Sequence, residues 1–199
     1  MLSGGPVRRA TARRSRGVTM LEVLIAIVIL TIGLLGVAGM QAQMQNAEVE
    51  AYQRAQAIVL LQDMVDRINS NRRNAANYVT VEPLGTDSVI DCTAPATVAA
   101  RDQCAWDAAL RGAAETAGGV QLGAMNGARG CISNPVAVMP RQVVVAVAWQ
   151  GVSPTAVPGG TDCGKDEFGA DDRFRRAMLA TIVIGCLQNN PATGVCVTP

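Results

Sequence analysis

Six cysteines carry the most evident chemistry in this 199-residue chain, and none of them lies in the first 91 residues. They are Cys92, Cys104, Cys131, Cys163, Cys186 and Cys196. No Cys-x-x-Cys pair occurs, so a zinc site is a poor explanation, whereas an even number in an exported chain favours disulfides over free, buried thiols. Six cysteines allow fifteen sets of pairs. Short loops favour Cys92 with Cys104 and Cys186 with Cys196, which leaves Cys131 with Cys163.

The chain contains no histidine. Its absence excludes Ser-His and Cys-His catalysis, His-ligated zinc and histidine pH switches. Catalysis would then depend on carboxylates or cysteines alone, and no motif of that kind is present. We therefore expect a protein that is not an enzyme and has no cofactor.

A group of acidic residues between positions 151 and 176 is the remaining cluster of side chains that could bind a metal ion or a partner. It comprises Asp162, Asp166, Glu167, Asp171 and Asp172. Carboxylate oxygens are calcium ligands, but the spacing is not that of an EF-hand, and Lys165 and Arg173 lie among the acids. These residues are therefore only weak calcium candidates. A solvated acidic loop and a protein-contact surface are the other interpretations.

An apolar run from Val18 to Met40 contains 23 residues and a single charge, Glu22. At about 1.5 Å per helical residue it is long enough to span a hydrocarbon core of about 30 Å. Five arginines precede this run: Arg8, Arg9, Arg13, Arg14 and Arg16. Every acidic residue of the chain comes after them. This asymmetry places the N-terminus in the cytoplasm and the rest of the chain outside it. The remainder is more acidic than basic, so we expect no nucleic-acid partner.

Glu22 needs an explanation, because an acid in a bilayer helix costs about 2.5–3.5 kcal/mol. Neither a plain anchor nor a secretory signal cleaved near Val37, Ala38 and Gly39 explains it. The segment Arg16-Gly17-Val18-Thr19-Met20-Leu21-Glu22 resembles the leader of type IV pilins and pseudopilins, with a basic region, glycine, an apolar residue and glutamate fifth. The run LTIGLLGVAGMQ is similar to PilV-type minor pilins.

This resemblance implies cleavage by the prepilin peptidase between Gly17 and Val18, and methylation of the new amino group of Val18. Val18 stands where the family usually has phenylalanine. Glu22 would pair with that amine, in its own or a neighbouring subunit, and so act in assembly. The alternative is a protonated Glu22 near the headgroups without a specific partner.

The implied organisation has four parts. Residues 1–17 form a cleaved leader, 18–40 the transmembrane or fibre-core half of a helix, 41–77 its amphipathic half, and 78–199 a disulfide-containing globular head. We expect the helix to end near Arg73. Glycines at 33, 36 and 39 serve either close helix packing or local unwinding.

The amphipathic half has one face with apolar or small residues in steps of three and four. These are Met44, Ala47, Ala51, Ala55, Ile58, Leu61, Val65 and Ile68. We expect this face to pack on the head, and a coiled coil is the less favoured alternative. The spacing also predicts ion pairs between Glu50 and Arg54 and between Asp63 and Arg67.

The head begins with a loop at 82–95, and a helix at Asp102–Glu115 should bury Trp106 and Leu110 on one face. Strand patterns follow at 129–138, interrupted by Pro135, at 142–150 and at 176–187. An antiparallel sheet would cover its apolar face with the helix. The fold class is therefore α+β, a type IV pilin fold with a long N-terminal helix on a small sheet.

The resemblance implies a minor pilin of a type IV pilus that primes assembly or joins the tip complex. A minor pseudopilin of a type II secretion system is the alternative, and a binding module could coexist with either. The expected location is the inner membrane, with a single span and a periplasmic head, and then the pilus. Expected partners are other minor pilins, the major pilin, the prepilin peptidase, the inner-membrane assembly platform and a tip adhesin.

Overall fold

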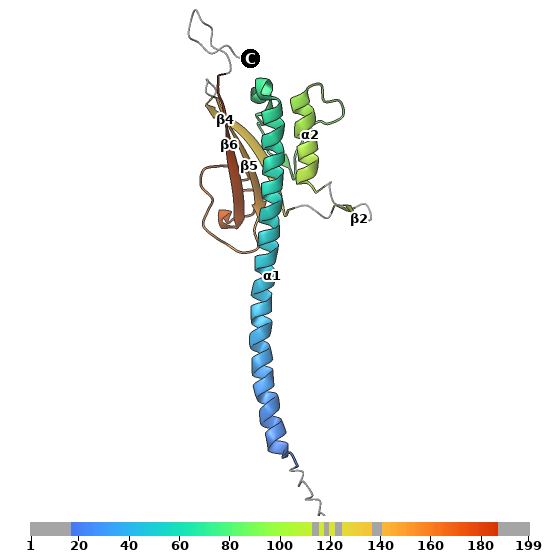
Figure 1. Ribbon diagram of the computed structural model, residues 1–199, viewed down its shortest axis with the longest axis vertical. Helices are drawn as coiled ribbons and strands as arrows, with labels where there is room; N and C mark the ends of the chain where they lie inside the picture. Colours follow the sequence, from blue (N-terminus) through green and yellow to red (C-terminus); the bar gives the residue numbers. More distant parts are fainter. Residues whose placement is uncertain (1–16, 113–115, 118–119, 122–124, 137–140, 187–199) are drawn as a thin grey trace, which may run out of the picture. The chain divides into compact units, whose positions relative to one another are not determined.

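The computed structural model describes residues 17–112, 116–117, 120–121, 125–136 and 141–186. The chain divides into two units, Met1–Gln45 and Asn46–Pro199. The described part of the first unit comprises residues 17–19 and the beginning of helix α1, which spans Met20–Ser70 (Figure 1). From Met20 to Gln45 every side chain is exposed.

Helix α1 ends at Ser70, and a 3₁₀ helix follows at Arg72–Tyr78. The sequence predicted an end near Arg73, so the helix is three residues shorter than expected. Asp63 and Arg67 form the predicted ion pair at 2.9 Å. Asp102 also contacts Arg67 at 3.2 Å and accepts a hydrogen bond from the Tyr78 hydroxyl. These contacts fix the end of α1 to the head.

The buried face of α1 is not the predicted one. Buried residues in the second unit are Gln53, Ala57, Leu61, Met64 and Ile68. Only Leu61 and Ile68 belong to the predicted face, whereas Ala51, Ala55 and Ile58 are exposed. Two apolar stripes lie side by side on this helix, and periodicity alone does not distinguish them.

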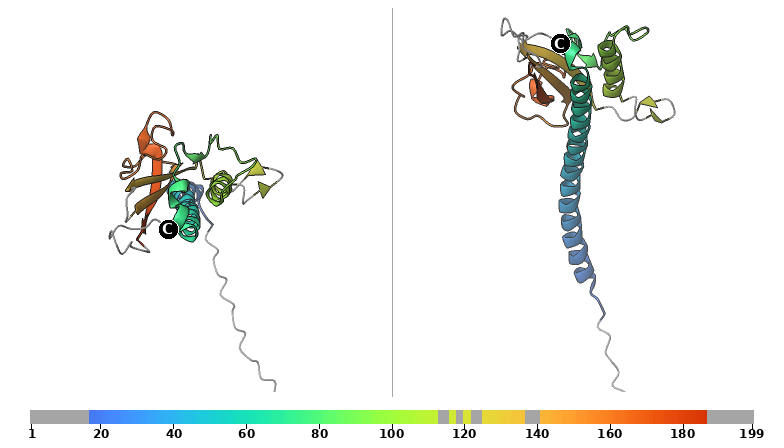
Figure 2. Two further views of the ribbon diagram at one scale, coloured as in Figure 1. Left: turned by 90° about the horizontal axis from the view of Figure 1, so that it is seen from above. Right: turned by 45° about the horizontal axis from the view of Figure 1, so that its top comes forward.

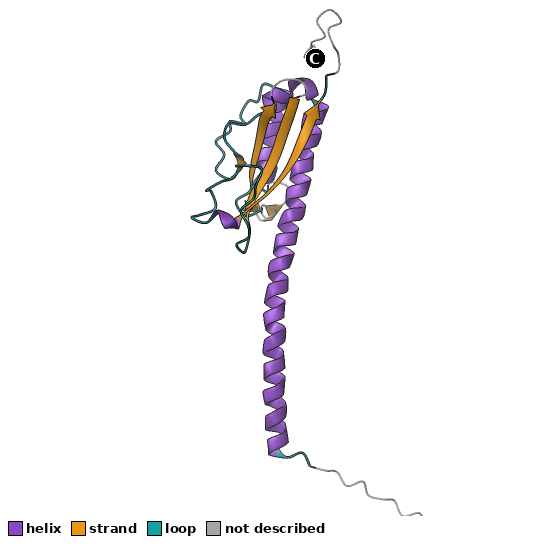
Figure 3. Cartoon of the chain, turned by 90° about the vertical axis from the view of Figure 1, so that its left-hand side faces the viewer, coloured by secondary structure: helices purple, strands orange, loops and turns teal. Residues whose placement is uncertain are grey.

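The head contains a four-stranded antiparallel sheet in the order β1-β4-β5-β6 (Figure 3). The strands are β1 Leu84–Gly85, β4 Arg129–Val136, β5 Arg141–Gln150 and β6 Arg175–Ile184. The three longer ones correspond to the predicted strands, although 137, 138 and 187 lie outside the described residues. Pro135 is accommodated in β4 by a register shift between Ser133 and Val136. The short strand β1 lies in the segment predicted to be a loop.

Alternation along β5 produces two faces with different neighbours. Val143, Val145, Val147 and Trp149 are buried in one core cluster with Ala57, Leu61, Met64 and Ile68 of α1. Ala146 and Ala148 point the other way and pack with Cys163 and Phe168 of the long β5–β6 loop. The sheet is therefore covered by the helix on one face and partly by this loop on the other.

Helix α2 spans Val98–Leu110, whereas the sequence predicted Asp102–Glu115. Thr97 caps its start by accepting from the Ala100 N–H at 3.1 Å, and Gly112 follows its end with φ +82°. These cap positions explain the shift. Trp106 is fully buried, as predicted, and its indole N–H donates to the Leu60 carbonyl at 2.8 Å. A two-stranded ribbon, β2 Thr116–Ala117 and β3 Val120–Gln121, follows.

In the second unit, α1 and α2 lie beside each other, and α2 also packs against β1 and β4 (Figure 2). Together with the antiparallel sheet, this arrangement confirms the predicted α+β class.

Candidate functional site

The predicted cleavage position lies in non-helical backbone just before α1. Gly17, Val18 and Thr19 precede the helix, and Val18 is 69% exposed. A Cβ added at Gly17 would have no atom within 4 Å. The fold itself therefore does not require glycine at this position, so a requirement for glycine would have to come from a molecule that recognises the segment.

Thr19 fixes where α1 begins. Its hydroxyl accepts from the Glu22 N–H at 3.3 Å, and its carbonyl accepts from the N–H groups of Glu22 and Val23 at 3.1 and 3.3 Å. This is an N-cap, with a carboxylate in the first turn where the positive end of the helix dipole favours it. Glu22 therefore lies within the first helical turn, close in sequence to Val18.

Among the described residues, α1 is the one helix long and apolar enough to cross a membrane. Its most apolar stretch of 18 residues has a mean hydropathy of 2.7 and is not buried in the structure. Exposed apolar side chains continue from Val18 to Met44. A segment of this kind needs a lipid or protein environment.

Two disulfides are present, Cys92–Cys104 and Cys131–Cys163. Cys92–Cys104 is a pair that a short loop favoured, and Cys131–Cys163 is the pair that was left over. Cys92–Cys104 joins the loop after β1 to α2, and Cys131–Cys163 joins β4 to the β5–β6 loop. Cys186 is also disulfide-bonded, and Cys196 lies outside the described residues. The Cys186–Cys196 pair stays a prediction.

The five weak calcium candidates are spread along the β5–β6 loop, and most of their side chains contact cations of this chain. Asp162 lies 3.9 Å from Lys165 and is almost fully exposed. Glu167 lies 3.0 Å from Arg129, which also contacts Asp87 at 3.0 Å. The Arg129 guanidinium stacks over Phe168 at 5.9 Å from the ring centroid. Arg129 thus ties the acidic loop to β4.

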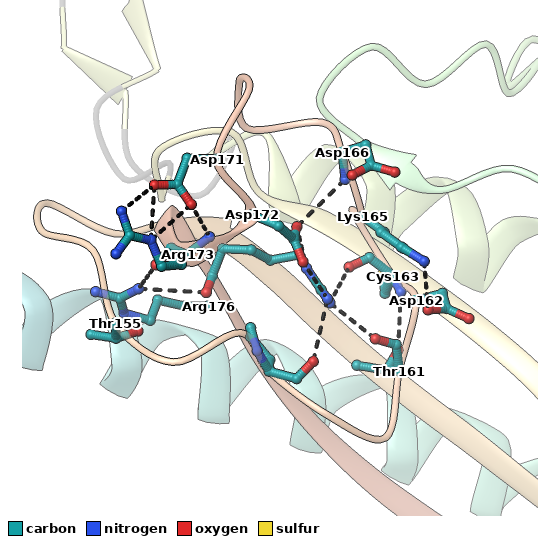
Figure 4. A network of polar contacts seen from close by, with 12 residues as sticks. Thr155, Thr161, Asp162, Cys163, Lys165, Asp166, Asp171, Asp172, Arg173 and Arg176 are labelled. Atoms are coloured by element: carbon teal, nitrogen blue, oxygen red, sulfur yellow. Dashed lines mark hydrogen bonds and ion pairs between the residues drawn. The ribbon is translucent and has the colours of Figure 1, made fainter.

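Asp171 and Asp172 also form ion pairs with basic side chains of this chain (Figure 4). Arg173 lies 2.8 Å from Asp171, and its hydrogen bonds hold the pKa of that carboxyl below its usual value. Asp172 contacts Arg175 at 2.9 Å and accepts from the Asp166 N–H at 3.5 Å. The described residues contain no group of three or more His, Cys, Asp or Glu able to hold a metal. Basic side chains lie within 4 Å of four of the five carboxylates, which disfavours the weak calcium interpretation relative to the other two.

Arg175 organises this loop, although no pattern in the sequence singles it out. The side chain is 2% exposed and donates to three backbone carbonyls, those of Pro158, Thr161 and Cys163, at 2.9 to 3.3 Å. The Nε and Nη2 atoms of Arg175 also donate to the Asp172 carboxylate, and these bonds lower the pKa of that carboxyl. A buried arginine is rare without such partners. Arg175 is the first residue of β6 but lies just before the strand predicted at 176–187, where the alternation gives no sign that it is buried.

Glu50 also has a different partner from the predicted one. Instead of Arg54, it contacts Arg176 at 3.0 Å and accepts from the Val152 N–H at 2.8 Å. A Cβ at Gly151 would lie 2.8 Å from the Glu50 carboxylate and 2.6 Å from the Arg176 guanidinium, so a side chain there would displace this pair. Glu50 thus attaches α1 to β6 through Arg176 and to the start of the β5–β6 loop through the Val152 N–H.

Comparison with known protein families gives two matches. Residues 12–38 match the family of the prokaryotic N-terminal methylation motif, and residues 39–109 match the type IV pilin Tt1218 family. No curated protein matches the chain, and no solved structure matches it. The first match contains Gly17, Val18 and Glu22, and the second contains the C-terminal part of α1, the Cys92–Cys104 disulfide and most of α2.

Proposed function

Because the chain belongs to the type IV pilins, we propose that it is a minor pilin of a type IV pilus, which primes pilus assembly or joins the tip complex. Pilins of this family are structural proteins, and the function proposed for the chain involves no catalysis. One observation carries the proposal. An exposed glycine that the fold does not need is followed directly by an apolar helix with an acid in its first turn.

The first step of the proposed function is processing. The prepilin peptidase would cleave between Gly17 and Val18, and the new amino group of Val18 would be methylated. The match to the N-terminal methylation motif supports this step, as does the exposed backbone at Gly17 and Val18. Cleavage would leave the Thr19 cap and the whole of α1 intact.

The second step is assembly through Glu22. After cleavage, the cationic amine of Val18 lies about one helical turn from Glu22, which can pair with it or with the amine of a neighbouring subunit. In a medium of low dielectric constant such a pair is strongly attractive, and an unpaired acid is costly. Glu22 would therefore fix the axial position of the subunit in the fibre.

The location follows from the same residues. The apolar half of α1 would span the inner membrane once, with the N-terminus in the cytoplasm and the head in the periplasm. The disulfides support a periplasmic head, because that compartment is oxidising. From there the subunit would enter the pilus. Its partners would be other minor pilins, the major pilin, the assembly platform and a tip adhesin.

The alternative is a minor pseudopilin of a type II secretion system, which would share the leader and Glu22. The head with six cysteines favours the pilus. Mass spectrometry of sheared surface pili separates the two proposals, because a pilus subunit is recovered with the fibres. Loss of protein secretion with intact pili in a deletion strain would support the pseudopilin instead.

The test of processing is intact and tandem mass spectrometry of the membrane-bound protein, from cells with and without prepilin peptidase. We expect a chain that begins at Val18, carries one extra methyl group and disappears without the peptidase. An uncleaved chain, or one that begins after Gly39, would overturn the proposal.

The test of assembly compares Glu22→Ala with Glu48→Ala. Both residues are exposed acids on α1, and Glu48 makes no ion pair among the described residues. We expect both variants to be cleaved normally and only Glu22→Ala to be depleted in sheared pili. Normal incorporation of Glu22→Ala would contradict the role of Glu22.

A further inference from the structure

The two described disulfides differ in how far an external thiol can reach them. Cys92 is exposed, whereas its partner Cys104 on α2 is partly buried. In the other bridge, Cys131 is partly buried and Cys163 is only 5% exposed. Thiol–disulfide exchange requires a thiolate to reach one of the two sulfurs directly. The first bridge therefore presents a reachable cysteine, and the second bridge is largely covered by the fold.

The cover over Cys163 is its own loop. Cys163 packs with Ala148 and Phe168 on the face of the sheet opposite α1. Its Sγ lies 3.8 Å from the Arg129 carbonyl oxygen, and its own carbonyl accepts from Arg175 at 3.3 Å. The bridge borders a groove of about 560 Å³, which is the size of a small-molecule pocket. A folded enzyme would have to lift the bonded loop to bring a thiol to this sulfur.

The Cys92–Cys104 bridge holds the loop that precedes α2. Residues 91–96 make no hydrogen bond or ion pair to any other segment that the structure describes, apart from the approach of Cys104 itself to the Asp91 carbonyl. Before this stretch, Arg111 donates to the Ser88 carbonyl at 3.0 Å, and after it Thr97 caps α2. Opening the bridge therefore releases residues 91–96 between two held ends.

Helix α2 does not depend on this bridge for its position. The Trp106 indole N–H donates to the Leu60 carbonyl of α1 at 2.8 Å. The Asp107 carboxylate accepts from the Gly85 N–H of β1 at 2.7 Å. Both contacts lie outside the loop that the bridge holds. The head can therefore stay folded while the bridge is open.

We propose that Cys92–Cys104 is a site of thiol–disulfide exchange on the folded head, opened and closed by a dithiol oxidoreductase. A thiolate of the enzyme attacks Cys92 Sγ and forms a mixed disulfide with it. The bond to Cys104 breaks, and its electron pair leaves on the Cys104 sulfur, which takes up a proton. The second thiol of the enzyme then attacks the mixed disulfide, which yields a Cys92 thiol and an enzyme oxidised to its own disulfide. The reverse sequence closes the bridge and passes two electrons to an oxidised enzyme.

This site goes beyond the proposed function, because it needs only the folded head and not the N-terminal segment. Cleavage at Gly17 and recovery in sheared pili are measured separately. Failure of the exchange site would therefore leave the proposed function standing.

The test exposes the oxidised full-length chain, in detergent, to a reduced thioredoxin-type dithiol protein, and free thiols are alkylated at intervals. Trypsin separates the four cysteines for mass spectrometry by cleaving after Arg101, Arg129, Arg141 and Lys165. We expect Cys92 and Cys104 to be alkylated about tenfold faster than Cys131 and Cys163, with the near-ultraviolet circular dichroism of the folded head retained. Equal rates, or the opposite order, would overturn the proposal.

The control repeats the measurement with the chain unfolded in guanidinium chloride and a small dithiol as the reductant. There the two bridges should open at similar rates, because the fold no longer covers Cys163. A difference that persists in the unfolded chain would overturn the proposal, since it could not come from the structure of the head.

A second measurement uses a dithiol protein whose second cysteine is replaced by serine, so that the mixed disulfide is trapped. We expect the trapped adduct on the peptide that contains Cys92, and an adduct on any other cysteine, or none, would contradict the proposal. Phe168→Ala is the matched variant, because it uncovers Cys163 and leaves the loop before α2 untouched. It should speed the opening of Cys131–Cys163 alone, and an unchanged rate would show that burial does not select between the bridges.

Discussion

Arg175 and Asp172 form a two-pronged ion pair at the foot of β6. Arg175 Nε lies 2.9 Å from Asp172 Oδ1, and Nη2 lies 2.9 Å from Oδ2. Parallel bonds of this kind hold both side chains in a single geometry. Because the same guanidinium bonds to three loop carbonyls, the pair determines the path of the β5–β6 loop.

Replacing Asp172 with Asn should therefore destabilise the head. The substitution leaves the buried charge of Arg175 uncompensated, which we expect to lower the free energy of unfolding by about 2 kcal/mol. Thermal unfolding of the full-length chain in detergent, followed by tryptophan fluorescence, measures the change. Asp171→Asn is the control, since its partner Arg173 is exposed and its loss should leave the Tm unchanged. Equal Tm values for the two variants would contradict the role of Arg175.

Tyr78 should make stability depend on alkaline pH. Burial and then the hydrogen bond to Asp102 raise the pKa of the Tyr78 hydroxyl to about 12, from an ordinary value of 10.0. A pKa raised in the folded state contributes stability that is complete below pH 10.0 and is lost as the pH rises toward 12. We expect the parent to lose stability over this interval and Tyr78→Phe to lose less. Unfolding measured between pH 8 and 11 tests this, with the exposed Tyr52→Phe as a control that keeps the parental slope.

The two disulfides should contribute unequally. Cys131–Cys163 closes a loop of 32 residues and Cys92–Cys104 one of 12. In the chain-entropy account, their removal costs about 4 and about 3 kcal/mol respectively. We expect the Cys131→Ser/Cys163→Ser double variant to unfold at lower temperature than Cys92→Ser/Cys104→Ser. The opposite order would show that the loop is held chiefly by Arg175 and Arg129.

Gly130 should tolerate no side chain. A Cβ there would lie 2.4 Å from the Trp106 ring and 2.7 Å from Leu110. Gly130→Ala must displace a buried tryptophan, so we expect a loss of about 2–3 kcal/mol in the free energy of unfolding. Gly159→Ala, with no atom within 4 Å of the new Cβ, should leave stability nearly unchanged. Near-ultraviolet circular dichroism reports whether the environment of Trp106 changes.

The sequence was most informative where a pattern is local. Alternation predicted β5 and its inner face of Val143, Val145, Val147 and Trp149, and an uninterrupted apolar and amphipathic run predicted α1. Loop length favoured the Cys92–Cys104 disulfide, and the Cys131–Cys163 pair was the one left after the short loops were assigned. The family prediction, a type IV pilin, is confirmed by the family matches, whereas the PilV-type assignment stays a prediction.

The errors concern contacts between distant segments. Glu50 was assigned to Arg54, four residues away, but it pairs with Arg176, 126 residues away. The buried stripe of α1 was misplaced because only the sheet determines which of two apolar stripes is covered. The sequence left three interpretations of the acidic loop open, because it does not show which carboxylates have arginine partners.

The contact between Glu50 and Arg176 also constrains the order of events during biosynthesis. Strand β6 is the last described strand along the chain, and it pairs with β5 over its full length. Until β6 has been synthesised, Trp149 and Ile182 cannot complete the core around Met64 and Ile68. The growing chain must therefore keep an apolar helix face uncovered during most of its synthesis. A folding factor that shields this face of α1 at this stage would protect the chain from aggregation.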